Sequence, residues 1–250
     1  PFYLLLRAGA PPEGEVAEFD PGTLLGAVAA FAKGHSQGEY IFDFQWAAAS
    51  EEAGIPYYPK LVVAAPVTPA TGKRILLSPQ LPEAMREPVA RALISAVREL
   101  SAELGCHSVH WLFITQEESG WLSDAGFIAR DSLQFHWRNR DYGCFDDFLG
   151  EMASRKRKKF KRERQKVYAQ IDNLRWLEGD AIDQAALDHL WSFYERTTDT
   201  HWGRAYLRPG FFHHLAELAP HRMRLIMVDK GGATIAGAMF METPQALYGR

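Results

Sequence analysis

Three residues that can exchange a proton lie close together near the start of the chain, in the stretch HSQGEYIFD: His35, Glu39 and Asp43. Carboxylate and imidazole side chains are the usual general bases of enzymes. Glu39 and Asp43 are four residues apart and would share one face of a helix, but not of a strand–turn junction. If the segment lines a cleft, we expect Glu39 to be the base, with Asp43 or His35 assisting it. Otherwise these polar residues only cap a loop.

A second group of candidates surrounds the apolar run at residues 60–66. Tyr57, Tyr58 and Lys60, in the phrase YYPK, could wall a substrate cleft in which the lysine meets a carboxylate or a phosphate; the tyrosines could equally pack at a strand edge. After the run, the phrase PVTPATGKR could bind an anion through backbone N–H groups and cationic side chains, or form a plain hairpin turn. The residues concerned are Thr68, Thr71, Gly72, Lys73 and Arg74.

The most basic stretch of the sequence is SRKRKKFKRERQKV. Nine of the twelve residues from Arg155 to Lys166 are Lys or Arg, in a chain whose net charge is −3. We expect a helix that contacts the phosphates of a nucleic acid or of a nucleotide-linked molecule. A solvated helix face and an attraction to anionic lipid headgroups are the alternatives. The residues expected to bind the polyanion are Arg155, Lys156, Arg157, Lys158 and Arg162.

The remaining chemical signals are weaker. The phrase HWGRAY, at residues 201–206, looks like a substrate-shaping loop between helices, so Trp202 and Tyr206 are candidate substrate contacts. Trp202 could equally be an ordinary core aromatic. The histidines show no metal-ligand spacing and the chain has only two cysteines, so we predict no metal site. The sequence contains no P-loop, no G-x-S-x-G motif and no dinucleotide fingerprint.

The composition is that of a folded protein. Of the 250 residues, 47% are hydrophobic and 12% aromatic, which suffices for one large domain or two ordinary ones. The two cysteines form no disulfide framework, so we predict a reducing compartment and a cytoplasmic location. No stretch approaches the roughly 20 apolar residues that span a bilayer.

These candidates must be positioned by strands and helices, and the first half of the chain alternates between them. A helix is predicted at residues 81–104, because Pro82 suits a first turn and apolar residues follow at helical spacing. A short helix at residues 121–125 ends at Gly126, and residues 138–143 form a hinge or linker. The strands predicted in this half are at residues 2–7, 15–19, 23–32, 60–66, 109–115 and 127–139, and residues 74–77 form a short apolar run.

The second half predicts helices at about residues 145–170, 182–198 and 211–218, and strands at residues 174–177, 224–229 and 234–241. Its end resembles the beginning of the chain: FYLLLR and TLLGA match RLIMVD and TIAGA. Each pair predicts a hairpin whose second strand carries a glycine, Gly26 or Gly237, at a site of close backbone approach. Chance is the alternative. A real repeat predicts a protein of roughly 400 residues, with roughly 50–70 before Pro1 and about 100 after Arg250.

The order of elements in residues 60–139 resembles the back half of a GNAT acyltransferase domain. The phrase from Trp121 and Leu122 to Gly126 and Phe127 is similar to the step that precedes the last strands of such domains. Two tandem GNAT-like domains, with a basic helical segment opening the second, resemble the FemAB-like family. Further stretches look like a bacterial FemAB-like subfamily: Lys33–Asp43, Tyr57–Lys60, Pro66–Arg74, Ser154–Lys158, Thr200–Leu207 and Leu247–Arg250.

The resemblance implies an α/β fold with two tandem GNAT-like domains. Residues 1–140 would be the first domain without its N-terminal part, and residues 141–250 the front part of a truncated second domain. It also implies an acyltransferase that acylates the amine of a small molecule or peptide. Such enzymes are similar to those that move an amino acid from aminoacyl-tRNA onto peptidoglycan precursors. The competing hypothesis is a non-catalytic GNAT scaffold that binds RNA or a membrane through its basic helix.

The acyl donor implied by the resemblance is aminoacyl-tRNA or acetyl-CoA, with no permanently bound cofactor. GNAT domains that use acetyl-CoA follow the central strand with a glycine-rich turn leading straight into a helix, whose N–H groups hold the pyrophosphate. Residues 66–74 contain one glycine and lead into another apolar run. This departure and the basic helix favour aminoacyl-tRNA. We expect tRNA as a partner, no stable DNA partner and at most peripheral membrane contact.

Overall fold

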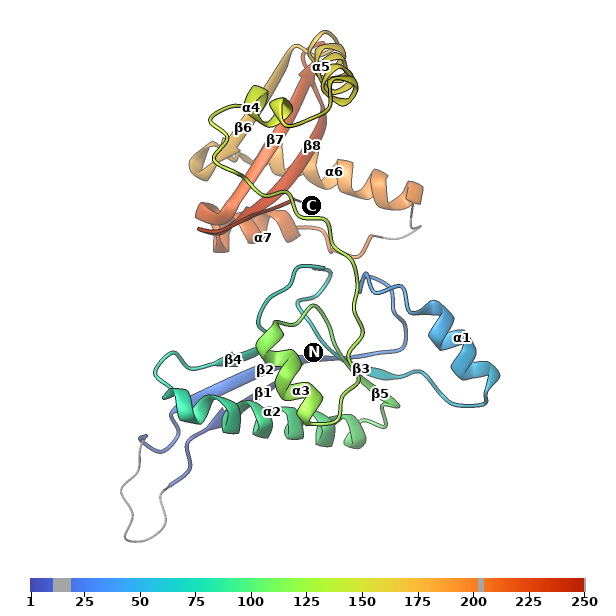
Figure 1. The fold of residues 1–250 in the computed structure, drawn as a ribbon, viewed down its shortest axis with the longest axis vertical. Helices are drawn as coiled ribbons and strands as arrows, with labels where there is room; N and C mark the ends of the chain where they lie inside the picture. Colours follow the sequence, from blue (N-terminus) through green and yellow to red (C-terminus); the bar gives the residue numbers. More distant parts are fainter. Residues whose placement is uncertain (11–18, 202–204, 250) are drawn as a thin grey trace. The chain divides into compact units, whose positions relative to one another are not determined.

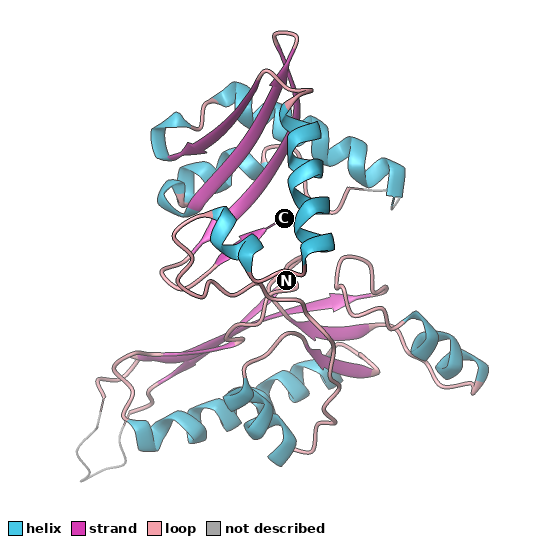
Figure 2. Cartoon of the chain, turned by 45° about the horizontal axis from the view of Figure 1, so that its top comes forward, coloured by secondary structure: helices cyan, strands magenta, loops and turns pink. Residues whose placement is uncertain are grey.

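The computed structural model of the chain describes residues 1–10, 19–201 and 205–249. It divides into two compact units, Pro1–Gln134 and Phe135–Arg250. Each unit combines one β-sheet with helices, as Figure 1 and Figure 2 show, which confirms the α/β class. The GNAT-like character of the units and the domain boundary after residue 140 stay predictions.

The first unit contains a five-stranded sheet in which β2 is the central strand. It pairs antiparallel with β1 along one edge and with both β3 and β4 along the other. Only β3 and β5 pair in parallel, with Lys60 opposite Ser108 and Val62 opposite His110. The strands are β1 (Phe2–Arg7), β2 (Leu24–Lys33), β3 (Lys60–Val63), β4 (Ile75–Leu77) and β5 (Ser108–Trp111).

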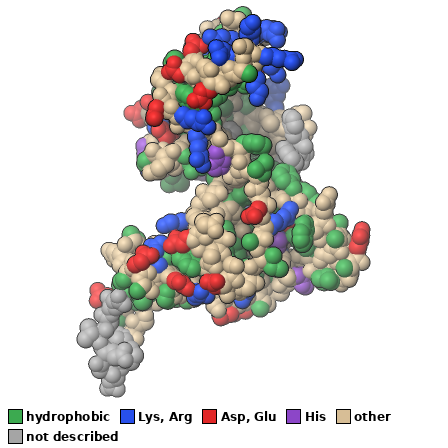
Figure 3. All heavy atoms as spheres, in the orientation of Figure 1, with side chains coloured by type: hydrophobic (Ala, Val, Ile, Leu, Met, Phe, Trp, Pro, Cys, Tyr) green, Lys and Arg blue, Asp and Glu red, His purple; other side chains and the backbone are tan. Residues whose placement is uncertain are grey.

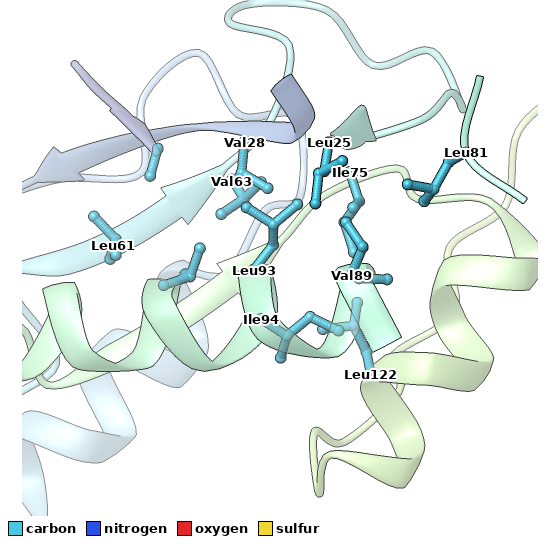
Figure 4. Packing of buried hydrophobic residues seen from close by; sticks show 13 residues of the cluster. Leu25, Val28, Leu61, Val63, Ile75, Leu81, Val89, Leu93, Ile94 and Leu122 are labelled. Atoms are coloured by element: carbon cyan, nitrogen blue, oxygen red, sulfur yellow. The ribbon is translucent and has the colours of Figure 1, made fainter. Parts of the chain in front are cut away.

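One face of this sheet is covered by the helix α2 (Glu83–Glu103), which connects β4 to β5. Its buried residues include Val89, Leu93, Ile94 and Val97, at the three- and four-residue spacing that forms one apolar stripe. Figure 4 shows three of them, Val89, Leu93 and Ile94, packed against the side chains of the sheet. Burial of one such side chain contributes about 1.5–3 kcal/mol. The predicted helix at residues 81–104 is therefore confirmed.

Two further helices complete the first unit. The helix α1 (Phe44–Glu52) was not predicted and buries none of its side chains. The helix α3 (Gln116–Asp124) begins five residues before the predicted Trp121. Its start is a capping box, in which the Thr115 and Glu118 side chains bind each other's backbone N–H groups. This pair of polar residues, and not an apolar stripe, fixes where the helix begins.

The strand predicted at residues 127–139 is wrong. Residues 128–140 have no regular secondary structure and join no sheet in the part of the chain that the structure describes. Ile128, Leu133 and Phe135 are more than four-fifths exposed. Apolar content alone does not make a strand where no neighbouring strand offers a ladder of hydrogen bonds. The strand predicted at residues 15–19 lies, except for Phe19, outside the described residues.

The second unit contains a four-stranded antiparallel sheet in the order β6-β7-β8-β9. Its core includes Leu187 and Leu190 of α6, Phe212 of α7, and Leu225 and Met227 of β7. The strands are β6 (Asn173–Glu178), β7 (Met223–Lys230), β8 (Ala233–Glu242) and β9 (Leu247–Gly249). The helices are α4 (Phe145–Gly150), α5 (Ser154–Tyr168), α6 (Gln184–His201) and α7 (Phe211–Leu218), with single 3₁₀ turns at Gly179–Ala181 and Pro220–Arg222. One helix predicted at residues 145–170 is thus two.

The two predicted hairpins are present, as β1–β2 and β7–β8, and both are interrupted by a register shift. A Cβ atom on Gly26 would lie 2.9 Å from Leu93 Cδ1, and one on Gly237 would lie 2.8 Å from Met227 Sδ. Real Cβ atoms do not approach so closely. At Gly26 the backbone oxygen of Leu76 would also lie 3.1 Å away, which agrees with the predicted close backbone approach, whereas the crowding at Gly237 comes from the side chains of Met227 and Phe193. In the described part of the chain, no helix is long and apolar enough to cross a membrane.

Candidate active site

Lys60 is at the centre of a buried polar cluster in the first unit. It is the first residue of β3 and its side chain is fully buried. Side chains alternate along a strand, so Leu61 and Val63 face α2 and Lys60 points to the opposite face of the sheet. Its Nζ atom donates three hydrogen bonds: to Ser36 Oγ at 2.6 Å, Glu39 Oε2 at 2.7 Å and Asp43 Oδ2 at 2.7 Å.

The loop between β2 and α1 supplies both carboxylates. Glu39 and Asp43 are 5% and 0% exposed, and burial of a charge is unfavourable unless an opposite charge is in contact. Lys33 lies directly opposite Lys60 in the sheet, and its Nζ atom is 2.9 Å from Glu39 Oε1. This contact is an ion pair without hydrogen-bond geometry. Two lysines therefore compensate two carboxylates, which accounts for their burial.

Two tyrosines enclose the cluster from the segment before β3. The Tyr57 hydroxyl donates to Asp43 Oδ2 at 2.7 Å, and the Tyr58 hydroxyl is 2.8 Å from Ser36 Oγ. Their ring centroids lie 5.5 and 5.7 Å from Lys60 Nζ, within the range of a cation–π interaction. The structure thus brings together five residues that the sequence placed in two separate candidate groups: Glu39, Asp43, Tyr57, Tyr58 and Lys60.

The hydrogen bonds of the cluster fix the protonation states of Asp43 and Tyr57. Burial alone would raise the pKa of Asp43, but hydrogen bonds from Lys60, Ser36 and Tyr57 outweigh it and lower the pKa to about 2. Burial and the hydrogen bond to Asp43 raise the pKa of Tyr57, which keeps its proton at neutral pH. Asp43 is therefore a weak base that anchors Lys60. Its second oxygen, Oδ1, is buried and has no hydrogen-bond partner among the described residues.

His110 is a titratable residue near the cluster that the sequence reasoning did not include in the site. It lies opposite Val62 in the parallel pair β3–β5, so its side chain is on the same face as Lys60. The ring is 5.8 Å from that of Tyr57, and Nε2 is 2.9 Å from Ser108 Oγ. Burial, followed by the charge of Lys60, lowers the pKa of His110. The imidazole is neutral at pH 7 and can accept a proton.

The loop that carries the carboxylates has an unusual backbone. Tyr40 and Phe42 have φ angles of 59° and 51°, a left-handed conformation that non-glycine residues rarely adopt. Such residues cost of order 1–3 kcal/mol each and persist where the surroundings fix them. Glu39 and Asp43 flank both positions, and their ion pairs to Lys60 supply this constraint. Strain of this kind is concentrated at functional sites.

The comparison with protein families identifies the family of the chain. The family model of the FemAB-like proteins, described as peptidoglycan biosynthesis/recognition, matches residues 7–250. The chain belongs to the FemAB-like family. The resemblance drawn from the motifs is therefore confirmed, and the family connects the chain with peptidoglycan and with transferase activity. No curated protein matches the chain.

In this FemAB-like chain, the turn predicted to bind an anion uses several of its donors internally, while Thr71 and Lys73 are exposed. The Gly72 N–H donates to Phe113 O at 3.0 Å, and the Arg74 guanidinium donates to Leu112 O and Ala70 O at 2.9 and 2.7 Å. Glu118 Oε1 accepts the backbone N–H groups of Arg74 and Ile75. The Thr68 hydroxyl donates to Pro66 O, and Thr71 is exposed. These hydrogen bonds connect the loop to the residues just after β5 and to the first turn of α3.

The structure describes two of the three remaining predicted residues, His35 and Tyr206. His35 is exposed, and its Nδ1 atom accepts the N–H of Gln37 in a local turn. Trp202 lies outside the described residues. Tyr206 belongs to the second unit, where its N–H donates to the Tyr194 hydroxyl. The described residues contain no group of three His, Cys, Asp or Glu side chains able to hold a metal ion.

The basic side chains of α5 differ in what they contact in this FemAB-like chain. Arg155, Lys158, Arg162 and Lys166 follow one another at spacings of three or four and are exposed, and Figure 3 shows Lys and Arg side chains gathered there. Lys156 is also exposed. The predicted Arg157 differs: its guanidinium donates to the carbonyls of three residues at the end of α4 and just after it, namely Leu149, Gly150 and Met152.

Proposed function

We propose that the chain is an acyltransferase that moves an aminoacyl group from aminoacyl-tRNA to an amine of a peptidoglycan or related cell-envelope precursor. The observation that carries the proposal is the family match over residues 7–250. The buried cluster around Lys60 supports it, because transfer to an amine needs a group that takes up the proton of the amine. The units would be GNAT-like domains, the first with the back-half order of elements.

The proposed reaction needs no covalent intermediate. The amine nitrogen attacks the ester carbonyl of the donor, a C–N bond forms and the C–O bond to the ribose breaks. The amine proton passes to a base and the ribose oxygen gains a proton. Glu39 is our first choice of base, with His110 as the second group, while Asp43 and Lys60 hold the loop. Asp43 Oδ1, which lacks a donor among the described residues, would accept an N–H of the amine.

A non-catalytic binding function is the second candidate, and one observation favours it. Lys60 is completely enclosed and hydrogen-bonded to both carboxylates, an arrangement that a purely structural cluster would also have. The family description includes recognition as well as biosynthesis. Acetyl-CoA as the donor has less support, because the loop after β3 uses the N–H of its one glycine, Gly72, and the Arg74 guanidinium internally.

The test supplies the full chain with both donors in parallel. One reaction contains tRNA charged with labelled amino acids and the other contains labelled acetyl-CoA, each with a nucleotide-linked peptidoglycan precursor as acceptor. Mass spectrometry of the acceptor then identifies the group added. An aminoacyl adduct supports the proposal, and an acetyl adduct identifies acetyl-CoA as the donor. Binding of the precursor without any adduct favours the non-catalytic function.

Matched variants separate catalysis from folding. Glu39→Gln keeps the shape of the side chain and should lower kcat by about 10²–10⁴ with little change in KM, since loss of a general base has this size. His110→Asn tests the second base, and Glu103→Gln, on the exposed end of α2, is the control. Full activity in both Glu39→Gln and His110→Asn would show that the cluster does not take part in the reaction.

A further inference from the structure

A cleft in the second unit combines aromatic rings with cationic side chains, and the proposed reaction does not use it. It consists of two adjoining cavities of about 350 and 480 Å³, which share Cys144 and Phe145 in their walls. The first cavity is almost entirely apolar. The second is lined in part by Lys161, Arg164 and Tyr168 of α5.

Four aromatic rings form the first cavity, and Phe148 is at their centre. Its ring centroid lies 5.9 Å from that of Trp137, 5.6 Å from Tyr142 and 5.8 Å from Phe145. Trp137 is nevertheless 63% exposed. Large aromatic rings that are fixed by their neighbours and still open to solvent are suited to stack on a flat ligand.

The second cavity adds positive charge beside these rings. The Arg164 guanidinium lies 4.1 Å from the centroid of the Phe145 ring and 5.4 Å from that of Tyr168. It has no ion-pair partner among the described residues, whereas Lys161 contacts Asp146 at 2.8 Å. One terminal nitrogen of the guanidinium donates to the Tyr168 hydroxyl at 3.3 Å. The other N–H groups can bind a phosphate, and a guanidinium presents them in a fork that matches phosphate geometry.

We infer that this cleft binds a nucleoside phosphate, with the base stacked among Trp137, Tyr142 and Phe148 and the phosphate on Arg164 and Lys161. A flat apolar cage selects a planar ring, and the adjacent cations select an anion attached to it. The same cations disfavour a cationic ligand in the cage. The nucleoside phosphate could be a free or precursor-linked nucleotide or the unpaired end of an RNA strand. The inference does not depend on the proposed acyl transfer.

Binding is measured by calorimetry on the full chain without any acyl donor. The probes are uridine diphosphate, uridine, inorganic phosphate, a single-stranded RNA hexamer and the corresponding RNA duplex. We expect the nucleotide and the hexamer to bind, and uridine and phosphate to bind at least about tenfold more weakly, because each offers half of the recognition. Similar affinity for the nucleotide and the hexamer indicates a free nucleotide, and tighter, more salt-sensitive hexamer binding indicates a strand.

Matched variants locate the site. Trp137→Ala should weaken nucleotide binding by about tenfold or more, within the range for loss of one base–aromatic stack. Trp46→Ala is the control: Trp46 is 62% exposed and also has an arginine, Arg130, 5.6 Å from its ring, but it lies in the first unit. Arg164→Gln should weaken the binding of the nucleotide but not the binding of uridine, which carries no phosphate. Equal effects of the two tryptophan variants, tighter duplex than hexamer binding, or no nucleotide binding at millimolar concentration would overturn the inference.

Discussion

Lys60 in the first unit is fully buried and contacts two carboxylates, whereas Lys158 in the second unit is exposed and has no ion-pair partner among the described residues. In the sequence, Lys60 is one lysine before an apolar run, and Lys158 is one of nine basic residues in twelve. The isolated Lys60 holds local structure together, whereas Lys158, inside the conspicuous run, does not. Local charge density therefore indicates where a chain can meet a partner, and not which charges hold its fold.

The strongest test of this difference is Lys60→Met. It leaves Glu39 and Asp43 buried without their shared cation, and removal of one side of a buried ion pair costs about 3–5 kcal/mol. We expect the free energy of unfolding, from urea titration, to fall by this amount. Lys33→Met is the control and should cost much less, because the Lys33 side chain is 20% exposed. Equal costs would mean that Lys60 is not the centre of the cluster.

The pH dependence of stability gives the second test. Asp43 has a pKa of about 2 in the folded chain and 3.8 ordinarily, so its stabilising effect is complete above pH ~4 and lost as the pH falls through 2. The free energy of unfolding should decline by up to about 2 kcal/mol between pH ~5 and ~2. Asp43→Asn should lack this part of the decline, and Asp131→Asn, at an exposed site, should retain it.

The third test compares two arginines on α5. Arg157→Ala removes donors to three carbonyls around the end of α4 and should cost about 1–2 kcal/mol. Arg155→Ala removes an exposed side chain and should change stability by less than about 0.5 kcal/mol. Thermal unfolding of both variants measures the difference. If Arg155→Ala proves as costly, the exposed face of α5 has a structural role.

The smallest expected effect on stability concerns the exposed face of α5. Arg155, Lys158 and Arg162 replaced together by Gln should change the free energy of unfolding by well under ~1 kcal/mol. If this face contacts phosphates, the dependence of log affinity for tRNA on log salt should flatten by up to about one unit per lost contact.

A triple variant of the same charge, in which Arg196, Arg208 and Lys230 are replaced by Gln, is the control for that measurement. These residues are exposed elsewhere in the second unit, so general attraction between charges would make both triple variants alike. An unchanged salt dependence in the α5 variant would leave that face as a solvated surface.

The elements that the sequence predicted correctly are those with a strong periodic pattern, such as α2, α7 and the β7–β8 hairpin. The capped start of α3 depends on two polar side chains, and the irregular segment at residues 128–140 depends on the absence of a strand beside it in the described chain. The spacing of apolar residues along the sequence indicates neither of these two features. These errors follow from contacts that a window of sequence does not contain.

The candidate site shows the same limit. Glu39, Asp43, Tyr57, Tyr58 and Lys60 were chosen for residue type, and the structure brings them together, although their roles stay predictions. His110 was missed because its position depends on the parallel pairing of β3 with β5 across an intervening helix. Had that pairing been assumed, the alternation of side chains would have placed His110 on the same face as Lys60.

The loop between β3 and β4 leaves the sheet and returns to the same edge of β2. Val63 pairs with Ala30 and Ile75 with Val28, so the two ends of the loop are fixed two residues apart on one strand. The hydrogen bonds of Gly72 and Arg74 fix the second part of the loop, so only the part before Ala70 can vary in length independently of the sheet. Doubling a flexible loop costs only about 0.6 kcal/mol in closure entropy. This is the position at which insertions could diversify the domain, or at which an engineer could graft a recognition segment, without altering the strands on either side.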